Sequence, residues 1–181
     1  MLNFCKDREL RQRIAKQRPR LYRIAYSWCH DEALADDLVQ ETLTKALKKF
    51  KTLKNADALE CWLYGILANC WRDHFRKQRD TQDIDDCDFT NDITPETDFE
   101  RQFVIDSIHS AVAELPINQR QVLTLVDLEG FSYAEVAEIL ETPIGTVMSR
   151  LCRARKSLMQ KLLDLKTHAT AHAAPLLRRV K

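Results

Sequence analysis

The segment Thr142–Lys161 concentrates side chains that suit contact with a polyanion. It contains five basic residues and no acidic residue. Projected on a helix, its apolar residues fall on one face and its small polar and basic residues on the opposite face. The apolar face can pack against a scaffold while arginine and lysine on the other face meet bases or phosphates. The residue types and their spacing therefore predict a DNA-recognition helix.

The two faces of this predicted helix are defined by residue. The apolar face consists of Val147, Leu151, Ala154 and Leu158. The residues predicted to contact DNA are Thr146, Met148, Ser149, Arg150, Cys152, Arg153 and Lys156. The alternative is an ordinary surface helix with a solvated charged face. Such faces usually mix both signs of charge, and this one does not.

A short helix that precedes the recognition helix completes a helix-turn-helix. Ser132 and Glu135 have the spacing of a capping box, in which each side chain satisfies the other residue's backbone amide. Thr142 is predicted to cap the second helix, and Pro143 to be its first residue. Two capped helices separated by three or four residues are typical of a helix-turn-helix.

Helical periodicity extends over most of the chain. Only three glycines occur, and long stretches consist of Leu, Ala, Lys, Glu, Arg and Gln, which predicts an all-α fold. Helices are predicted over Leu10–Trp28 with a restart at Pro19, from an Asp31 cap to about Phe50, and over Leu59–Gln78, Phe99–Leu115 and Gln119–Leu128. Lys51–Ala58 is polar and non-periodic, which predicts a loop.

Charge divides the chain into blocks. Residues 1–79 carry 17 basic and 10 acidic residues, residues 80–100 carry nine acidic and no basic ones, and residues 101–181 carry 11 basic and eight acidic ones. We therefore predict two small helical domains, a bundle over 1–79 and a helix-turn-helix domain over 101–165. An acidic flexible linker over 80–100 joins them, and residues 166–181 form a disordered tail. Such a linker would let the two basic domains lie far apart on one partner.

Several classes of protein are disfavoured. The N-terminus is charged throughout and lacks a signal peptide, and no apolar run approaches the ~20 residues of a membrane span. The six cysteines include no Cys-x-x-Cys pair, so reduced cytosolic thiols, several of them buried, are expected. No Ser/His/Asp order, glycine-rich phosphate loop or complete metal set appears, so an enzyme is disfavoured.

With these motifs in hand, the chain resembles bacterial extracytoplasmic-function (ECF) sigma factors. In the second domain the resemblance rests on Glu114-Leu115-Pro116, Gln119–Leu123, Gly145-Thr146-Val147, Ser149-Arg150-Leu151 and Arg153-Ala154-Arg155. In the first domain it rests on Asp36–Thr42, Trp62–Asn69 and Asp73. Together these motifs cover most of Arg18–Leu163 in the family's order.

The resemblance implies a non-catalytic, cytoplasmic subunit that directs core RNA polymerase to promoters. The first domain would bind the polymerase clamp and the minus-ten element, and the second would bind the minus-thirty-five element. No metal, nucleotide or cofactor is implied. An anti-sigma factor is an expectation that rests on the resemblance alone.

An acidic-amide patch is assigned to the clamp. It consists of Asp36, Asp37, Gln40 and Glu41 on one polar helix edge of an otherwise basic domain. Such a patch suits a basic protein surface rather than DNA. The alternative is a bias of acidic residues toward a helix N-terminus, where the helix dipole favours them.

A second set is assigned to minus-ten DNA. It consists of Lys51, Lys54, Asn55, Asn69, Arg72, Arg76 and Lys77. The basic helix residues suit a track along single-stranded DNA, and the loop aligns with the family segment that receives an unstacked base. Trp62 and Trp71 could stack on bases, with core packing favoured for Trp62.

The sequence departs from the family's frequent pattern at two places. The loop Phe50–Asp57 lacks an aromatic-Arg-Gly motif, so its base preference is expected to differ. Met148 and Cys152 replace positions that are often basic and aromatic or His, so minus-thirty-five preference should differ as well.

Two other functions fit part of this pattern. A helix-turn-helix repressor or activator would act without being a polymerase subunit, and site-specific binding to a palindromic operator would favour it. A helical adaptor that binds only proteins would tolerate reversal of Arg150 and Arg153 to glutamate, whereas promoter-dependent function would not.

Overall fold

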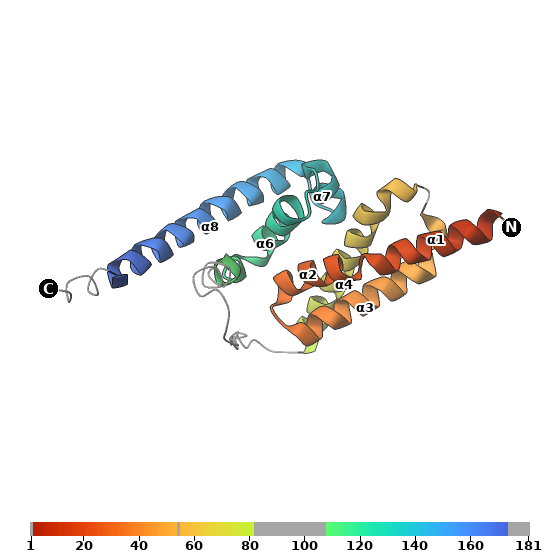
Figure 1. Ribbon diagram of the computed structural model, residues 1–181, viewed down its shortest axis with the longest axis horizontal. Helices are drawn as coiled ribbons and strands as arrows, with labels where there is room; N and C mark the ends of the chain where they lie inside the picture. Colours follow the sequence, from red (N-terminus) through yellow and green to blue (C-terminus); the bar gives the residue numbers. More distant parts are fainter. Residues whose placement is uncertain (1, 54, 82–107, 174–181) are drawn as a thin grey trace.

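The structure, a computed structural model, describes residues 2–53, 55–81 and 108–173, with the side chains of 7–53, 55, 57–76 and 108–163. All regular secondary structure in these ranges is helical, which confirms the predicted fold class. Figure 1 shows one group of helices containing α1 to α4 beside a second group that ends in the long α8. Most of the predicted linker lies outside the described residues.

The N-terminal half is a bundle of four helices, α1 (Leu2–Lys16), α2 (Arg18–Cys29), α3 (Glu32–Lys49) and α4 (Leu59–Thr81). The predicted restart at Pro19 is confirmed, because the proline lies in the first turn of α2. The Asp31 cap is also confirmed, since its carboxylate accepts a hydrogen bond from the Leu34 amide at 2.9 Å. Leu21, Leu38 and Leu63 are among the side chains that fill the bundle core.

Two short 3-10 turns lie within the predicted loop between α3 and α4. They are η1 (Phe50–Thr52) and η2 (Ala56–Ala58). Phe50 is buried and anchors the first turn, while the Asn55 side chain caps the second by accepting from the Asp57 amide at 2.9 Å. The described parts of the loop assigned to minus-ten DNA are therefore held by a short turn on each side.

The C-terminal half comprises a helical segment over 108–113, then α6 (Ile117–Leu123), η3 (Thr124–Leu128), α7 (Tyr133–Ile139) and α8 (Ile144–Ala173). The predicted helix Gln119–Leu128 begins earlier than expected and widens into the π-helical segment η3. It ends at Gly130, whose φ of 79° lies in the left-handed region that favours glycine.

Helix α8 is longer than the sequence analysis predicted. It continues to Ala173, whereas a disordered tail was expected from residue 166 onward. Residues 167–173 contain three alanines and neither glycine nor proline, so their sequence is compatible with a continued helix; Pro175 follows two residues later. Within the described residues, no helix combines the length and apolar character needed to cross a lipid bilayer.

The two halves share one continuous apolar core. The buried cluster includes Trp28, Leu67 and Trp71 from the first half and Val122 and Leu125 from the second. Helix α7 packs against α4, and α2 packs against both α6 and η3. The described parts of the two halves are therefore in direct contact, and each helps to bury the other's side chains.

Candidate nucleic-acid interface

The recognition helix has the two faces that the sequence predicts. Val147, Leu151 and Ala154 are buried in α8, and Leu158 is half-buried. Ser149, Cys152, Arg153 and Lys156 are exposed on the other side, together with Met148, which is 52% exposed; Thr146 is half-buried at the start of this face. The capping box of α7 is also present, because the Ser132 amide donates to Glu135 at 2.8 Å and the Glu135 amide donates to Ser132 at 3.3 Å.

The start of α8 differs from the prediction. The Pro143 carbonyl accepts from the Val147 amide at 3.1 Å, so Pro143 precedes the helix rather than being its first residue. The Thr142 hydroxyl instead donates to the Leu140 carbonyl at 3.1 Å and closes the turn. Thr142 is therefore not the cap, because its side chain is already used within the turn formed by Glu141, whose φ is 51°.

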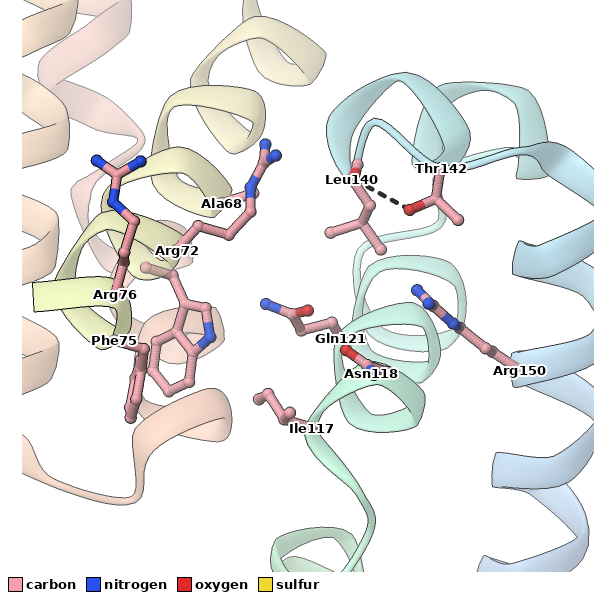
Figure 2. A pocket seen from close by; sticks show the side chains of 11 residues that line it. Ala68, Arg72, Phe75, Arg76, Ile117, Asn118, Gln121, Leu140, Thr142 and Arg150 are labelled. Carbon is pink, nitrogen blue, oxygen red and sulfur yellow. Dashed lines mark hydrogen bonds between the residues drawn. The ribbon is translucent and has the colours of Figure 1, made fainter. Parts of the chain in front are cut away.

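The basic residues of α8 do not all face the same way. Arg155 forms a two-point ion pair with Asp127 of η3, with nitrogen–oxygen distances of 2.6 and 3.1 Å. Arg150 is half-buried and lines a cavity between the two halves (Figure 2). The exposed basic face of the described part of α8 is consequently narrower than predicted, with Arg153 and Lys156 on it.

The predicted minus-ten residues of α4 lie along one exposed edge of the helix. The Arg72 guanidinium donates to the Asn69 side chain one turn earlier and forms an ion pair with Glu141 at 3.0 Å. Arg76 forms an ion pair with Asp73 at 3.3 Å. The three side chains Asn69, Arg72 and Arg76 are thus brought together as predicted, with acidic partners already beside both arginines.

Asn55 and Asn69 line the same cavity of about 570 Å³, which lies where the loop meets α4. Trp62 contributes a half-buried wall of this cavity, and Glu138 and Ile139 of α7 form the opposite wall. An indole beside two amide side chains can stack on a base and hydrogen-bond its edge. The cavity is therefore the place in the described chain that best suits an unstacked base.

Both tryptophans of α4 pack against the core, as was favoured for Trp62, but to different extents. Trp71 is 6% exposed and packs edge-on against Trp28, with ring centroids 5.9 Å apart, so it belongs to the core. Trp62 packs against the edge of the core and is half-buried, and it also lines the cavity. Periodicity places both residues near the boundary of the core. It does not determine how much of each ring is buried once the helices have packed.

Of the remaining basic residues of this set, Lys51 is the one whose side chain the structure describes. Lys51 is exposed in η1 and lies outside the cavity. Lys54 falls outside the described residues. Lys77 lies on the described backbone of α4, but its side chain is not described.

The predicted clamp patch is present on α3. Asp37, Gln40 and Glu41 are exposed, and Asp36 is half-buried. Two bases flank the patch, because Arg18 pairs with Asp36 and Lys45 pairs with Glu41, each at 2.9 Å. The patch is thus partly neutralised at its edges, while Asp37 and Gln40 remain available at its centre.

Four of the six cysteines can be placed. Cys29, Cys61, Cys70 and Cys152 are free thiols, of which Cys29 and Cys70 are buried. Burial raises the pKa of both buried thiols. The exposed Cys152 lies on the recognition face, as predicted.

The sequence analysis missed the residues that join the two halves. Arg20 and Arg23 of α2 both contact the carboxylate of Glu129, and the Trp28 indole donates to the Thr124 hydroxyl at 2.9 Å. No local pattern could have identified these contacts, because their partners lie about a hundred residues apart in the chain.

Comparison with protein families gives two matches in the predicted order. Residues 14–81 match Sigma-70 region 2, and residues 105–158 match Sigma-70, region 4. The first match contains the α3 patch and the α4 edge, and the second contains α7 and the exposed face of α8.

Curated relatives and solved structures agree with this division. The ECF RNA polymerase sigma factor EcfG of Rhodopseudomonas palustris is 34% identical over 151 residues, 82% of each chain. SigV of Bacillus subtilis, an RNA polymerase sigma factor, is 30% identical over 82% of this chain and 88% of its own. The sigma factor RpoE in complex with the anti-sigma factor NepR from Bartonella quintana matches with a TM-score of 0.68 and 29% identity, over 85% of this chain and 96% of that one.

A second solved structure, CnrH in complex with the cytosolic domain of CnrY, has a TM-score of 0.63 and 26% identity and covers 87% of this chain. The two family matches, in this order along the chain, and these relatives show that the chain belongs to the ECF RNA polymerase sigma factors. It is accordingly a transcription initiation subunit that directs promoter-specific initiation.

Proposed function

We propose that this sigma factor reads the minus-thirty-five element with the exposed face of α8. The assignment rests on the two faces of this helix. The apolar face is buried or half-buried along its length, and the described residues of the opposite face include no acidic side chain. Arg153 and Lys156 supply phosphate or base contacts, and Ser149 allows close approach. Met148 and Cys152 add apolar contacts, which suit thymine methyl groups.

The α4 edge and the adjoining loop contact the minus-ten element. Arg72 and Arg76 meet the phosphate backbone, and the cavity beside Trp62 accepts a base that has left the stack. Asn55 and Asn69 are the two amides placed to hydrogen-bond that base, because both line the cavity. This half therefore supplies the melting function, and the α8 face supplies the duplex contact.

The α3 patch binds core RNA polymerase. A surface of Asp37, Gln40 and Glu41 repels DNA phosphates and attracts a basic protein surface. It lies on a different helix from either predicted DNA-binding face, so a single molecule can contact polymerase and promoter together. We assign all catalysis of RNA synthesis to core polymerase, place the protein in the cytoplasm with it, and expect an anti-sigma partner of the kind that the RpoE and CnrH structures contain.

Charge reversal on α3 tests the polymerase assignment. Asp37→Lys with Glu41→Lys should weaken association with core polymerase by at least about tenfold, because two attractive charges become repulsive. The matched control is Asp7→Lys with Glu9→Lys on α1, which makes the same change of charge away from the patch. Co-elution from a sizing column and titration with labelled protein measure the affinity. Equal affinities for the two double variants would contradict the assignment.

A further inference from the structure

A cavity of about 460 Å³ lies between α4 of the first half and α6 and α8 of the second (Figure 2). Its volume falls within the range of small-molecule sites in proteins, roughly 300–1,000 Å³. The described residues that line it include three arginines, two aromatic rings and two amide side chains, but no acidic residue. This combination of side chains suits a ligand that has both a negative charge and a planar ring.

The covered side of the cavity contains an amide without a partner. Gln121 of α6 is 9% exposed, and Figure 2 shows its side-chain amide pointing into the cavity. In the described part of the chain the Gln121 carbonyl of the backbone accepts from Thr124, but the side-chain amide has no hydrogen-bond partner. Buried polar side chains in folded proteins are usually paired. A ligand that satisfies this amide must offer both a donor and an acceptor.

The three arginines of the cavity differ in how far their charge is already neutralised. The exposed Arg72 pairs with Glu141 at 3.0 Å. The exposed Arg76 pairs with Asp73 at 3.3 Å. Arg150 is half-buried and forms no ion pair with the described residues. A partly desolvated guanidinium is stabilised by a bound anion, and a phosphate matches its planar set of donors. The charge available to a ligand is therefore mainly that of Arg150.

Aromatic side chains of α4 form the wall opposite α6. The Trp71 ring is fixed in the core and contacts Phe75, with ring centroids 4.3 Å apart. Phe75 is 37% exposed, so part of its ring is open to a ligand. Ile117 and Leu140 of the second half also line the cavity and are half-buried. A planar ring that stacks on Phe75 therefore finds apolar contacts from both halves.

We propose that this cavity binds a nucleoside phosphate, with the base between Phe75 and the Gln121 amide and the phosphate at Arg150. A base supplies the planar ring, and an adenine edge offers a donor and an acceptor side by side, which suits a glutamine amide. The phosphate supplies the negative charge. Arg72 and Arg76 belong to the set assigned to minus-ten DNA, so the bound ligand competes with promoter DNA for them. This consequence alone rests on the proposed function.

Calorimetric titration of the full chain tests the proposal, with ATP as the probe and inorganic pyrophosphate and adenosine as separate arms. ATP should bind at least about tenfold more tightly than either fragment, because it alone engages both the rings and Arg150. Arg150→Gln should weaken ATP binding by at least about fivefold. The control Arg153→Gln removes the same charge from the exposed face of the same helix and should bind ATP like wild type. Equal affinities for the two variants, or no saturable binding of ATP, would overturn the proposal.

A second variant keeps the test decisive if Arg150→Gln loses its helical circular dichroism. Phe75→Leu removes the flat ring and keeps an apolar side chain, so it should weaken ATP binding by at least about fivefold and leave pyrophosphate binding unchanged. Equal weakening of both ligands would overturn the placement of the base.

A fluorescent single-stranded DNA 20-mer separates a small ligand from a DNA strand. Arg150→Gln should affect binding of the 20-mer less than binding of ATP, because Arg150 lies in the cavity and not on the α4 edge. If both ligands weaken equally, the cavity receives a DNA strand and the proposal is wrong. The ATP titration contains no DNA, so its result stands even if α4 proves not to bind the minus-ten element.

Discussion

Three arginines of the C-terminal half show how environment decides the role of one residue type. Arg120 is buried and donates to backbone carbonyls, and burial lowers its pKa from the ordinary value. Arg155 is held by Asp127, whose hydrogen bond raises its pKa. Arg153 is exposed and forms no ion pair with the described part of the chain. Of these three, Arg153 is the one available to DNA.

Removal of that side chain should affect promoter recognition alone. Arg153→Ala should weaken binding to the minus-thirty-five element by about 5- to 150-fold, as expected for loss of one specific arginine contact of ~1–3 kcal/mol. The thermal midpoint should stay unchanged, because the Arg153 side chain is exposed. Arg155→Ala is the contrasting variant, since it breaks a contact inside the fold. An unchanged transcript level with Arg153→Ala would remove this residue from the site.

His30 predicts a pH dependence of stability. Burial, followed by the positive Arg120 and the nearby His109, lowers the pKa of His30 to about 4, and its buried Nε2 has no hydrogen-bond partner. An unfolded histidine has a pKa of about 6.5. Between these values the unfolded chain binds a proton that the folded chain does not. The free energy of unfolding should therefore fall as pH is lowered from about 6.5 to 4.

His30→Asn is the variant that isolates this contribution, because asparagine tolerates the φ of 53° at this position. Urea unfolding followed by circular dichroism at several pH values measures it. Wild-type protein should lose more stability over this pH range than the variant. Parallel losses in the two proteins would show that His30 is not the group responsible.

Exposure of individual residues was predictable, but their partners were not. The periodicity of α8 correctly placed Val147 inside and Arg153 outside, because a single helix defines both faces. Arg72 was correctly placed on an exposed edge, yet its partner Glu141 lies 69 residues away. Such pairs depend on how the helices pack, and the local pattern holds no information about that.

At the level of elements, the capping box of α7 offers a clean test. Ser132→Ala removes the hydroxyl that accepts from the Glu135 amide and should cost about 1 kcal/mol of stability. For a protein of this size that corresponds to a fall of ~2–4 °C in the thermal midpoint. Ser157→Ala in the middle of α8 is the control, because alanine favours a helix interior. Equal midpoints for the two variants would contradict the capping role.

The elements that the sequence predicted best are those with local signals at both ends. Asp31 and Ser132 start helices at the expected residues, because each side chain caps the first turn. The π-helical widening of η3 was missed, and it coincides with Thr124, which accepts from Trp28 in the other half. The predicted and observed local structures therefore differ at η3, where a contact with the other half of the protein is present.

At the level of the whole molecule, the charge pattern predicted two basic halves that a long linker could hold apart. The structure instead packs them together, because three of the contacts across the interface involve buried polar groups with matched partners. The net charge of each half predicts how the halves interact on average at long range. It holds no information about which buried polar groups pair across one interface. The sequence thus predicted two helical domains in the order that the family matches show, whereas the packing of one half on the other required the coordinates.

Transcription in vitro is the measurement that tests the central claim most directly. Purified protein is combined with core RNA polymerase and a library of genomic DNA fragments, and the 5′ ends of the transcripts are sequenced. We predict transcripts from a small set of start sites that share one minus-thirty-five and one minus-ten sequence, and the signal should require both the protein and core polymerase. Start sites identical to those of core polymerase alone, or no transcripts at all, would contradict the account.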